Sequence, residues 1–214
     1  VQTCALPIVI VGRGGENLYA QVFNSDGVRT GNLISVGPTV PGPQEFPCVT
    51  ALENQTFVVI WKTSDTSLSG KVFDSSGTII HDMTLTTLEY SGSIMFPKVV
   101  GLKDGAFVAF WQGTLVSGGN EVDIFKRTFF ANGTLEAAES IVNNNIQRDQ
   151  KSPSVAKLSN GGYAVAWVSY EGLLATSKAF VAIFSSTNEK IVQDFEVGPS
   201  SEEDREIISL AGLA

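Results

Sequence analysis

The chain has 214 residues, a formal net charge of −8, 17% charged residues and 43% hydrophobic residues. An acidic chain without a cluster of Lys and Arg argues against nucleic-acid binding, because such binding needs cations that displace the counterions of the phosphate backbone. No apolar run approaches the length of about 18 residues that spans a membrane, so the sequence also predicts no membrane insertion.

The N-terminal residues 1–8, VQTCALPI, match no other part of the chain and resemble the translation of a common sequencing adapter. We treat them as a non-native scar, with a genuine N-terminal segment as the alternative. Excluding Cys4 leaves Cys48 as a lone thiol in an apolar strand, where cysteine behaves as a small hydrophobic residue. A single histidine and no second nearby cysteine argue against a metal site.

A motif that begins with proline and ends with tryptophan recurs three times along the chain. The copies are Pro47–Trp61, Pro97–Trp111 and Pro153–Trp167. Their tryptophans are 111 − 61 = 50 and 167 − 111 = 56 residues apart. A second landmark, a phenylalanine followed by a turn, keeps the same period at Phe23, Phe73, Phe129 and Phe184. Self-similarity at this period indicates a propeller or another repeat array.

The two landmarks divide the chain into units, taken here in order. Residues 9–44 form a partial unit with a strand at Leu18–Phe23. Complete units are expected at 45–94, 95–150 and 151–204, each with four short strands joined by turns of Gly, Asn and Asp. Residues 205–214 resemble the start of another unit, so we expect a piece of a longer array that continues in the same polypeptide.

The apolar pattern within each unit predicts how the strands pack. The strand that ends in tryptophan, such as Phe57–Trp61, is apolar on both faces and should lie between neighbouring sheets. The following strand, such as Asp123–Phe129, is mixed and should lie further out. We therefore predict an all-β partial β-propeller of four-stranded antiparallel blades, kelch-like in period, at about 50–56 residues a blade. A tandem β-sandwich is the alternative, although sandwiches of the immunoglobulin type use about 100 residues a domain.

The aromatic landmarks are assigned to the core. A carbohydrate-binding platform of tryptophans is the alternative, but their place at the end of a buried strand favours packing between blades. The expected structural core residues are Trp61, Trp111, Trp167, Phe23, Phe73, Phe129 and Phe184.

The sequence shows no catalytic set and no cofactor-binding motif. His81 is the single histidine and is expected to face solvent, and Glu136 with Glu139 is expected to be solvated charge rather than a pair of glycosidase acids. The loops Gly12–Asn17 and Ser117–Asp123 contain oxygen ligands that suit Ca²⁺, but neither has the EF-hand spacing, so we favour ordinary loops.

Two sequons for N-glycosylation occur, at Asn54 and Asn132. Both fall at expected hairpin tips, which are the exposed places that a glycan requires. They favour a glycoprotein in a secretory setting.

The motif Pro153–Trp167, together with Arg127–Gly133, resembles propeller-forming repeats of large secreted or surface-attached adhesin-like proteins. The resemblance covers most of residues 9–214 and carries no catalytic motif, and it departs from the pattern at Asn54-Gln55 and at Ala182-Ile183.

This resemblance implies a non-enzymatic scaffold, at the cell surface or outside the cell, that binds a protein or glycan ligand. We therefore expect a binding or adhesion segment and no enzyme. The alternative is a fragment of a propeller enzyme of the glycoside hydrolase type whose catalytic residues lie outside this chain.

Overall fold

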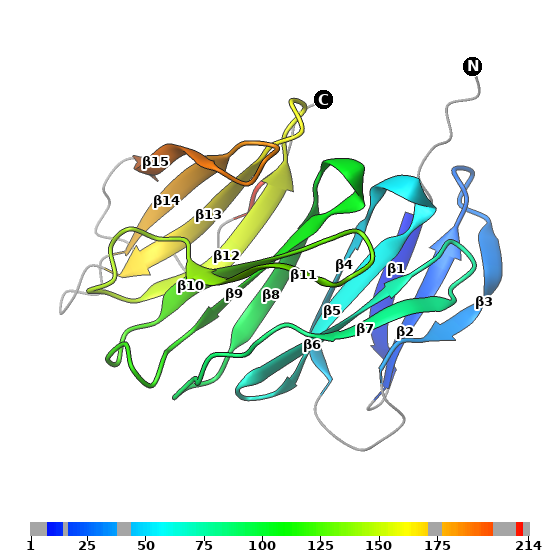
Figure 1. Cartoon of the computed structure of the whole chain (residues 1–214), viewed down its shortest axis with the longest axis horizontal. Coiled ribbons are helices and arrows are strands. Elements are labelled where there is room, and N and C mark those ends of the chain that lie inside the picture. Colours follow the sequence, from blue (N-terminus) through cyan, green and yellow to red (C-terminus); the bar gives the residue numbers. More distant parts are fainter. Residues whose placement is uncertain (1–7, 15–16, 38–43, 171–176, 199–208, 212–214) are drawn as a thin grey trace.

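The computed structural model describes residues 8–14, 17–37, 44–170, 177–198 and 209–211, and this part of the chain is built from β-strands and two 3-10 turns (Figure 1). The elements are β1 (Ile8–Gly14), β2 (Asn17–Phe23), β3 (Arg29–Ser35), β4 (Glu45–Ala51), η1 (Glu53–Gln55), β5 (Phe57–Ser64), β6 (Ser67–Phe73), β7 (Ile79–Thr84), β8 (Met95–Gly101), η2 (Lys103–Gly105), β9 (Phe107–Gly113), β10 (Asp123–Phe129), β11 (Leu135–Ile141), β12 (Gln150–Lys157), β13 (Tyr163–Tyr170), β14 (Ser177–Phe184) and β15 (Lys190–Val197).

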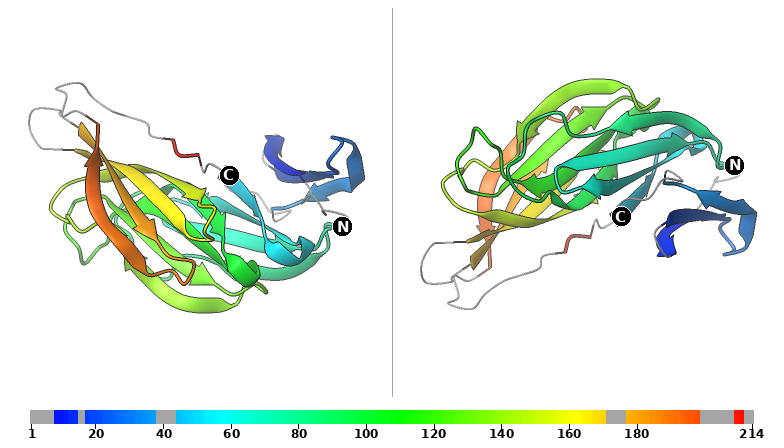
Figure 2. Two further views of the ribbon diagram at one scale, coloured as in Figure 1. Left: turned by 90° about the horizontal axis from the view of Figure 1, so that it is seen from above. Right: turned by 90° about the horizontal axis from the view of Figure 1, so that it is seen from below.

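Each repeat unit folds into one antiparallel sheet in sequence order. The strand orders are β4-β5-β6-β7, β11-β10-β9-β8 and β12-β13-β14-β15, and the first unit contributes a three-stranded sheet, β1-β2-β3. The prediction of four-stranded antiparallel blades is therefore confirmed for the sheets β4–β7, β8–β11 and β12–β15. The chain is a partial β-propeller, with its sheets arranged side by side (Figures 1 and 2).

The first strands of the four units, β1, β4, β8 and β12, lie next to one another and are the inner strands of the array. The tryptophan strands β5, β9 and β13 are second from the axis, and the outer strands β7, β11 and β15 are mostly exposed. The apolar pattern alone does not show this order, because a strand that is buried on both faces can be first or second.

Each tryptophan strand packs against two sheets, one on each of its faces, which explains why it is apolar on both. Val58 and Ile60 pack with Trp111 of the following sheet, whereas Val59 and Trp61 pack on the preceding one. Successive side chains of a strand point to opposite faces, so each tryptophan strand contributes to two blade interfaces at once.

The phenylalanine landmark also has a structural cause. The first residue of each tryptophan strand is paired with the phenylalanine that ends the next strand, as in Phe57 with Phe73. The two rings stack, with centroids 5.0 Å apart in that pair, 5.1 Å for Phe107 with Phe129 and 4.8 Å for Tyr163 with Phe184. Stacked aromatic pairs contribute beyond the apolar area that they bury.

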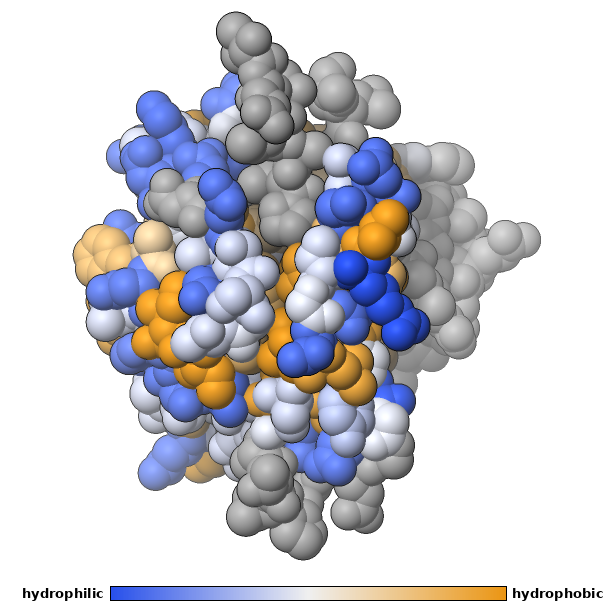
Figure 3. All heavy atoms as spheres, turned by 90° about the vertical axis from the view of Figure 1, so that its right-hand side faces the viewer, coloured by the Kyte–Doolittle hydropathy of each residue, from blue (hydrophilic) through white to orange (hydrophobic). Residues whose placement is uncertain are grey.

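The surface mixes hydrophobic and hydrophilic side chains. On the side of the molecule that carries the β1–β3 sheet, Figure 3 shows hydrophobic patches between hydrophilic ones. Exposed apolar residues occur on outer strands, such as Leu33 of β3 and Ile80 of β7. Within the described residues, no helix is long and apolar enough to cross a membrane.

Candidate functional site

The longest connections between strands lie at one end of the sheets. At the end where β4, β8 and β12 begin, the connections 85–94, 114–122 and 142–149 have ten, nine and eight residues. At the opposite end the connections 102–106 and 130–134 have five residues each. Binding and catalytic residues concentrate in loops that a rigid scaffold holds in place. We call the first end the loop end and look there for a site.

A strained bulge recurs at the loop end of three adjacent inner strands. Phe46, Phe96 and Ser152 have φ values of 51°, 52° and 57°, and each directly precedes a proline. The pairing register shifts at each of these places, between Glu45 and Cys48 in β4, Met95 and Lys98 in β8, and Lys151 and Ser154 in β12. Bulges and left-handed non-glycine residues are concentrated at functional sites.

The bulges bring two aromatic rings together at the loop end of the inner strands. The rings of Phe46 and Phe96 meet edge to face with centroids 5.4 Å apart, and Phe46 is 37% exposed. At the third bulge, the N–H of Ser152 donates to Gln112 Oε1 over 2.7 Å. We call the region formed by Phe46, Phe96, Lys62 and the three polar partners of Lys62, which are Glu45, Asp65 and Ser93, the mouth.

Lys62 is a buried cation at the mouth. It directly follows Trp61 on β5, and its side chain is 6% exposed. Its Nζ lies 2.8 Å from Asp65 Oδ1, 2.8 Å from Ser93 Oγ and 3.7 Å from Glu45 Oε2. The hydrogen bond from Lys62, followed by its charge, lowers the pKa of Asp65. Asp65 therefore remains ionised under mildly acidic conditions.

A second acidic region lies at the loop end, nearer the outer strands. Asp123 begins β10, and its Oδ1 accepts a hydrogen bond of 2.7 Å from Asn143 Nδ2. Burial raises the pKa of Asp123, and the nearby charges of Glu121 and Asp149 add to this effect. Glu121, Asp149 and Tyr170 line an adjoining cavity of about 380 Å³. Within the described residues, no three His, Cys, Asp or Glu side chains are placed to hold a metal ion.

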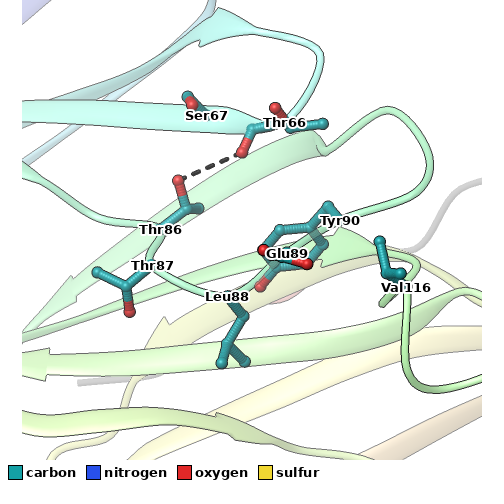
Figure 4. A pocket seen from close by; sticks show the side chains of 8 residues that line it. All are labelled: Thr66, Ser67, Thr86, Thr87, Leu88, Glu89, Tyr90 and Val116. Atoms are coloured by element: carbon teal, nitrogen blue, oxygen red, sulfur yellow. Dashed lines mark hydrogen bonds between the residues drawn. The ribbon is translucent and has the colours of Figure 1, made fainter.

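A third feature of the loop end is a hydroxyl-lined cavity of about 400 Å³ between the β4–β7 and β8–β11 sheets, shown in Figure 4. Its lining comes from the β5–β6 turn, the β7–β8 loop and the β9–β10 loop. We call it the threonine pocket.

The residues proposed from the sequence lie elsewhere. Trp61, Trp111 and Trp167 are at most 1% exposed, so their rings form no open platform. Of the phenylalanine landmarks, Phe73, Phe129 and Phe184 are buried and Phe23 is half-buried.

The sequon residues lie at the end opposite to the loop end. Asn132 is exposed in the β10–β11 turn, where its Oδ1 accepts hydrogen bonds from the N–H and hydroxyl of Thr134, and Asn54 lies within η1.

Expectations for the charged residues were partly wrong. Glu139, expected to be solvated, has a side chain that is 1% exposed and lies 3.6 Å from Arg127 Nη1. His81 is half-buried, while Glu136 is exposed. Of the two suggested Ca²⁺ loops, Ser117–Asp123 is described and Gly12–Asn17 lies partly outside the described residues.

Sequence reasoning missed the mouth. Its one available signal was the aromatic–proline step at Phe46-Pro47 and Phe96-Pro97, which recurs 96 − 46 = 50 residues apart. Nothing in the composition marks those residues as strained, because a positive φ is expected of glycine rather than phenylalanine.

No family model and no curated protein match the chain. Solved structures do. An α-L-arabinanase from Penicillium chrysogenum, complexed with arabinobiose, matches with a TM-score of 0.60 and 14% identity over 92% of this chain and 68% of that one. An α-L-arabinofuranosidase from Fusarium graminearum, in complex with an iminosugar inhibitor, matches with a TM-score of 0.59 and 13% identity over 85% of this chain and 58% of that one. An endo-arabinase from Bacteroides thetaiotaomicron matches with a TM-score of 0.51 and 11% identity over 91% of this chain and 77% of that one.

These similarities correct the expectation of a non-enzymatic adhesion or scaffold segment. The three solved structures named above are an arabinanase, an arabinofuranosidase and an endo-arabinase, and none of them is an adhesin. The expectation of no enzyme was therefore wrong, and the glycoside hydrolase alternative is the better supported one. At identities this low the likeness establishes the fold: the chain has the β-propeller fold of these glycoside hydrolases.

Proposed function

We propose that the chain is the propeller part of a carbohydrate-active enzyme of the glycoside hydrolase type and that it binds a neutral glycan at the mouth. The observation that carries this proposal is the strained bulge at the start of three adjacent inner strands, beside a buried Lys62. Bulges of this kind re-aim side chains, and backbone strain of this kind concentrates at functional sites.

The side chains of the mouth suit a sugar. The exposed ring of Phe46, against that of Phe96, offers an apolar surface to the C–H face of a sugar ring. Lys62 and Ser93 carry hydrogen-bond donors, and Glu45 and Asp65 carry acceptors for sugar hydroxyl groups. Such a mixture of apolar surface and a few placed polar groups is typical of ligand sites.

One carboxylate of the mouth suits one of the two roles in glycoside hydrolysis. Hydrolysis uses one protonated carboxyl group as acid and one ionised carboxylate as base or nucleophile. The lowered pKa of Asp65 suits the ionised role. The acid would have to come from outside this cluster, in agreement with the alternative that places catalytic residues beyond this chain.

We propose further that residues 205–214 begin another blade. The N–H of Leu210 donates to Ser154 Oγ over 3.0 Å, and Leu210 packs beside Ala164 and Val181. It follows Ser154 by 210 − 154 = 56 residues, the spacing of the last two tryptophans. Residues 209–211 also lie on the same side of the molecule as the β1–β3 sheet (Figure 2).

An extracellular location fits a glycan-processing role. Glycosylation at Asn54 or Asn132, at the opposite end of the sheets, would leave the loop end open to substrate. Mass spectrometry of the protein secreted from a eukaryotic host would reveal whether either site is occupied.

The proposal is tested by titrating the whole chain with arabinobiose. We expect saturable binding that Phe46→Ala weakens about tenfold, since one aromatic contact is worth about 1.4 kcal/mol. Phe130→Ala is the matched control, because this phenylalanine is 48% exposed at the other end of the sheets. Equal loss of binding in both variants, or no binding by the unaltered chain, would contradict the proposal.

A further inference from the structure

The threonine pocket adjoins the mouth, because its lining residue Thr66 directly follows Asp65, and hydrogen bonds from a neighbouring sheet fix its wall. The wall is the β7–β8 loop, and the residue that fixes it, Glu139, belongs to β11 of the neighbouring sheet. Glu139 Oε1 accepts the N–H of Thr87 over 2.5 Å, and Oε2 accepts the N–H of Leu88 over 3.1 Å. The carboxylate thus holds two consecutive peptide groups of the wall.

The carboxylate is itself held in a buried network. Arg127 Nη1 lies 3.6 Å from Glu139 Oε1 and donates to the carbonyl of Leu85 over 2.6 Å. The hydroxyl of Tyr90 donates to Glu139 Oε2 over 3.4 Å and accepts the indole N–H of Trp111 over 2.9 Å. Burial, followed by the charge of Glu139, raises the pKa of Tyr90, so its hydroxyl stays a donor. The wall is therefore preorganised before any ligand arrives.

The same arrangement recurs at the next interface. Asp194 of β15 accepts the N–H of Asn144 in the β11–β12 loop over 2.6 Å and pairs with Lys190. Glu139 and Asp194 each follow the phenylalanine landmark of their unit by ten residues, since 139 − 129 = 194 − 184 = 10. A carboxylate ten residues after the phenylalanine landmark thus fixes the loop between two blades at these two interfaces.

The pocket is lined by hydroxyl groups that are available for hydrogen bonds to a ligand, and by apolar side chains. Within the part of the chain that the structure describes, the hydroxyl groups of Thr66 and Ser67 have no hydrogen-bond partner in the protein. Leu88 and Val116 are 44% and 58% exposed, and Glu89 and Tyr90 lie between them (Figure 4). Glu89 is the one charged residue among those that line the pocket.

We propose that the threonine pocket binds one or two sugar units of a neutral oligosaccharide, as a second site formed by residues other than those of the mouth. Hydroxyl side chains both donate and accept, which matches a ligand that carries hydroxyl groups. The exposed Leu88 and Val116 match the C–H faces of sugar rings, and Glu89 with the net charge of −8 disfavours an anion. The volume lies at the lower end of the range for ligand sites, about 300–1,000 Å³.

This inference does not depend on the proposed function, because different residues form the two sites. The test is a titration of the isotope-labelled chain with arabinobiose, and separately with maltose and cellobiose, followed by nuclear magnetic resonance. We expect at least one of the three sugars to shift the amides of Thr66, Ser67 and Leu88 in a saturable way. Shifts at the pocket without shifts at Phe46 would contradict only the proposed function, and the reverse result would contradict only this inference.

Two sets of variants sharpen the test. The double change Leu88→Ser with Val116→Ser removes exposed apolar walls and should weaken binding at the pocket about fivefold or more. Glu139→Gln should speed amide exchange at Leu88 and weaken the same binding, because Glu139 is a positioning residue. Glu136→Gln, on the same strand but exposed, is the matched control and should change neither. Unchanged affinity in the double variant would overturn the inference.

Discussion

Replacing Glu139 by leucine should destabilise the chain far more than its surface-like sequence context suggests. The change leaves the guanidinium of Arg127, whose side chain is 7% exposed, without its carboxylate, and it removes the acceptor of two backbone N–H groups. Breaking a buried ion pair by removing one partner costs about 3–5 kcal/mol. We therefore expect a loss of this size in the free energy of unfolding.

A double-mutant cycle separates the ion pair from the other contacts. In the double variant with Arg127→Leu and Glu139→Leu no buried charge is left unpaired, although the N–H groups of Thr87 and Leu88 remain without an acceptor. It should recover about 1–2 kcal/mol relative to the single Glu139→Leu variant, since contacting residues couple by about 0.5–3 kcal/mol. Glu136→Leu on the same strand should stay within about 0.5 kcal/mol of wild type.

Urea unfolding followed by the fluorescence of the buried tryptophans measures these differences. A Glu139→Leu variant as stable as Glu136→Leu would refute the reasoning, as would a double variant that loses the sum of the two single changes. Either result would mean that the ion pair is solvated in solution rather than buried.

Other perturbations test the core and one buried cation. Trp111→Ala should cost about 3–5 kcal/mol in the same unfolding assay, whereas Phe130→Ala, 48% exposed, should cost about 0.5 kcal/mol or less. Burial, followed by the charge of Lys190, lowers the pKa of Lys126 from 10.5 to about 8. Between these two values the unfolded chain binds more protons at this position, so stability should rise with pH across that window. Lys126→Met should remove this rise, and a rise that persists in the variant would contradict the assignment.

Much of the fold was predictable because its interfaces repeat. Each blade needs a strand that packs on both faces and an aromatic pair that joins this strand to the next. Residues equivalent to Trp61 and Phe73 therefore recur at the same spacing in each unit. The order of strands from the axis outward was not predictable in the same way. It is set by contacts between separate units, such as β4 with β8, and no pattern within one unit encodes them.

The site was less predictable than the fold. Phe46 is an ordinary apolar residue in the sequence. We assign it to the site because its φ is positive, and the residue type does not predict that conformation. Glu139 lies on an outer strand of mostly exposed residues, and it is buried only because the loop of the previous blade covers it. Both cases depend on neighbours that are distant along the chain.

The alternation within the tryptophan strands has a mechanical consequence. Because Val58 and Val59 stabilise opposite interfaces, the array behaves as a row of units with nearest-neighbour coupling, each joined to the next through one strand. A substitution at Val58 should loosen only the contact with the β8–β11 sheet, and one at Val59 only the contact with the β1–β3 sheet. Substitutions at two adjacent residues can thus weaken two blade interfaces separately, so that one interface can open while the next stays intact.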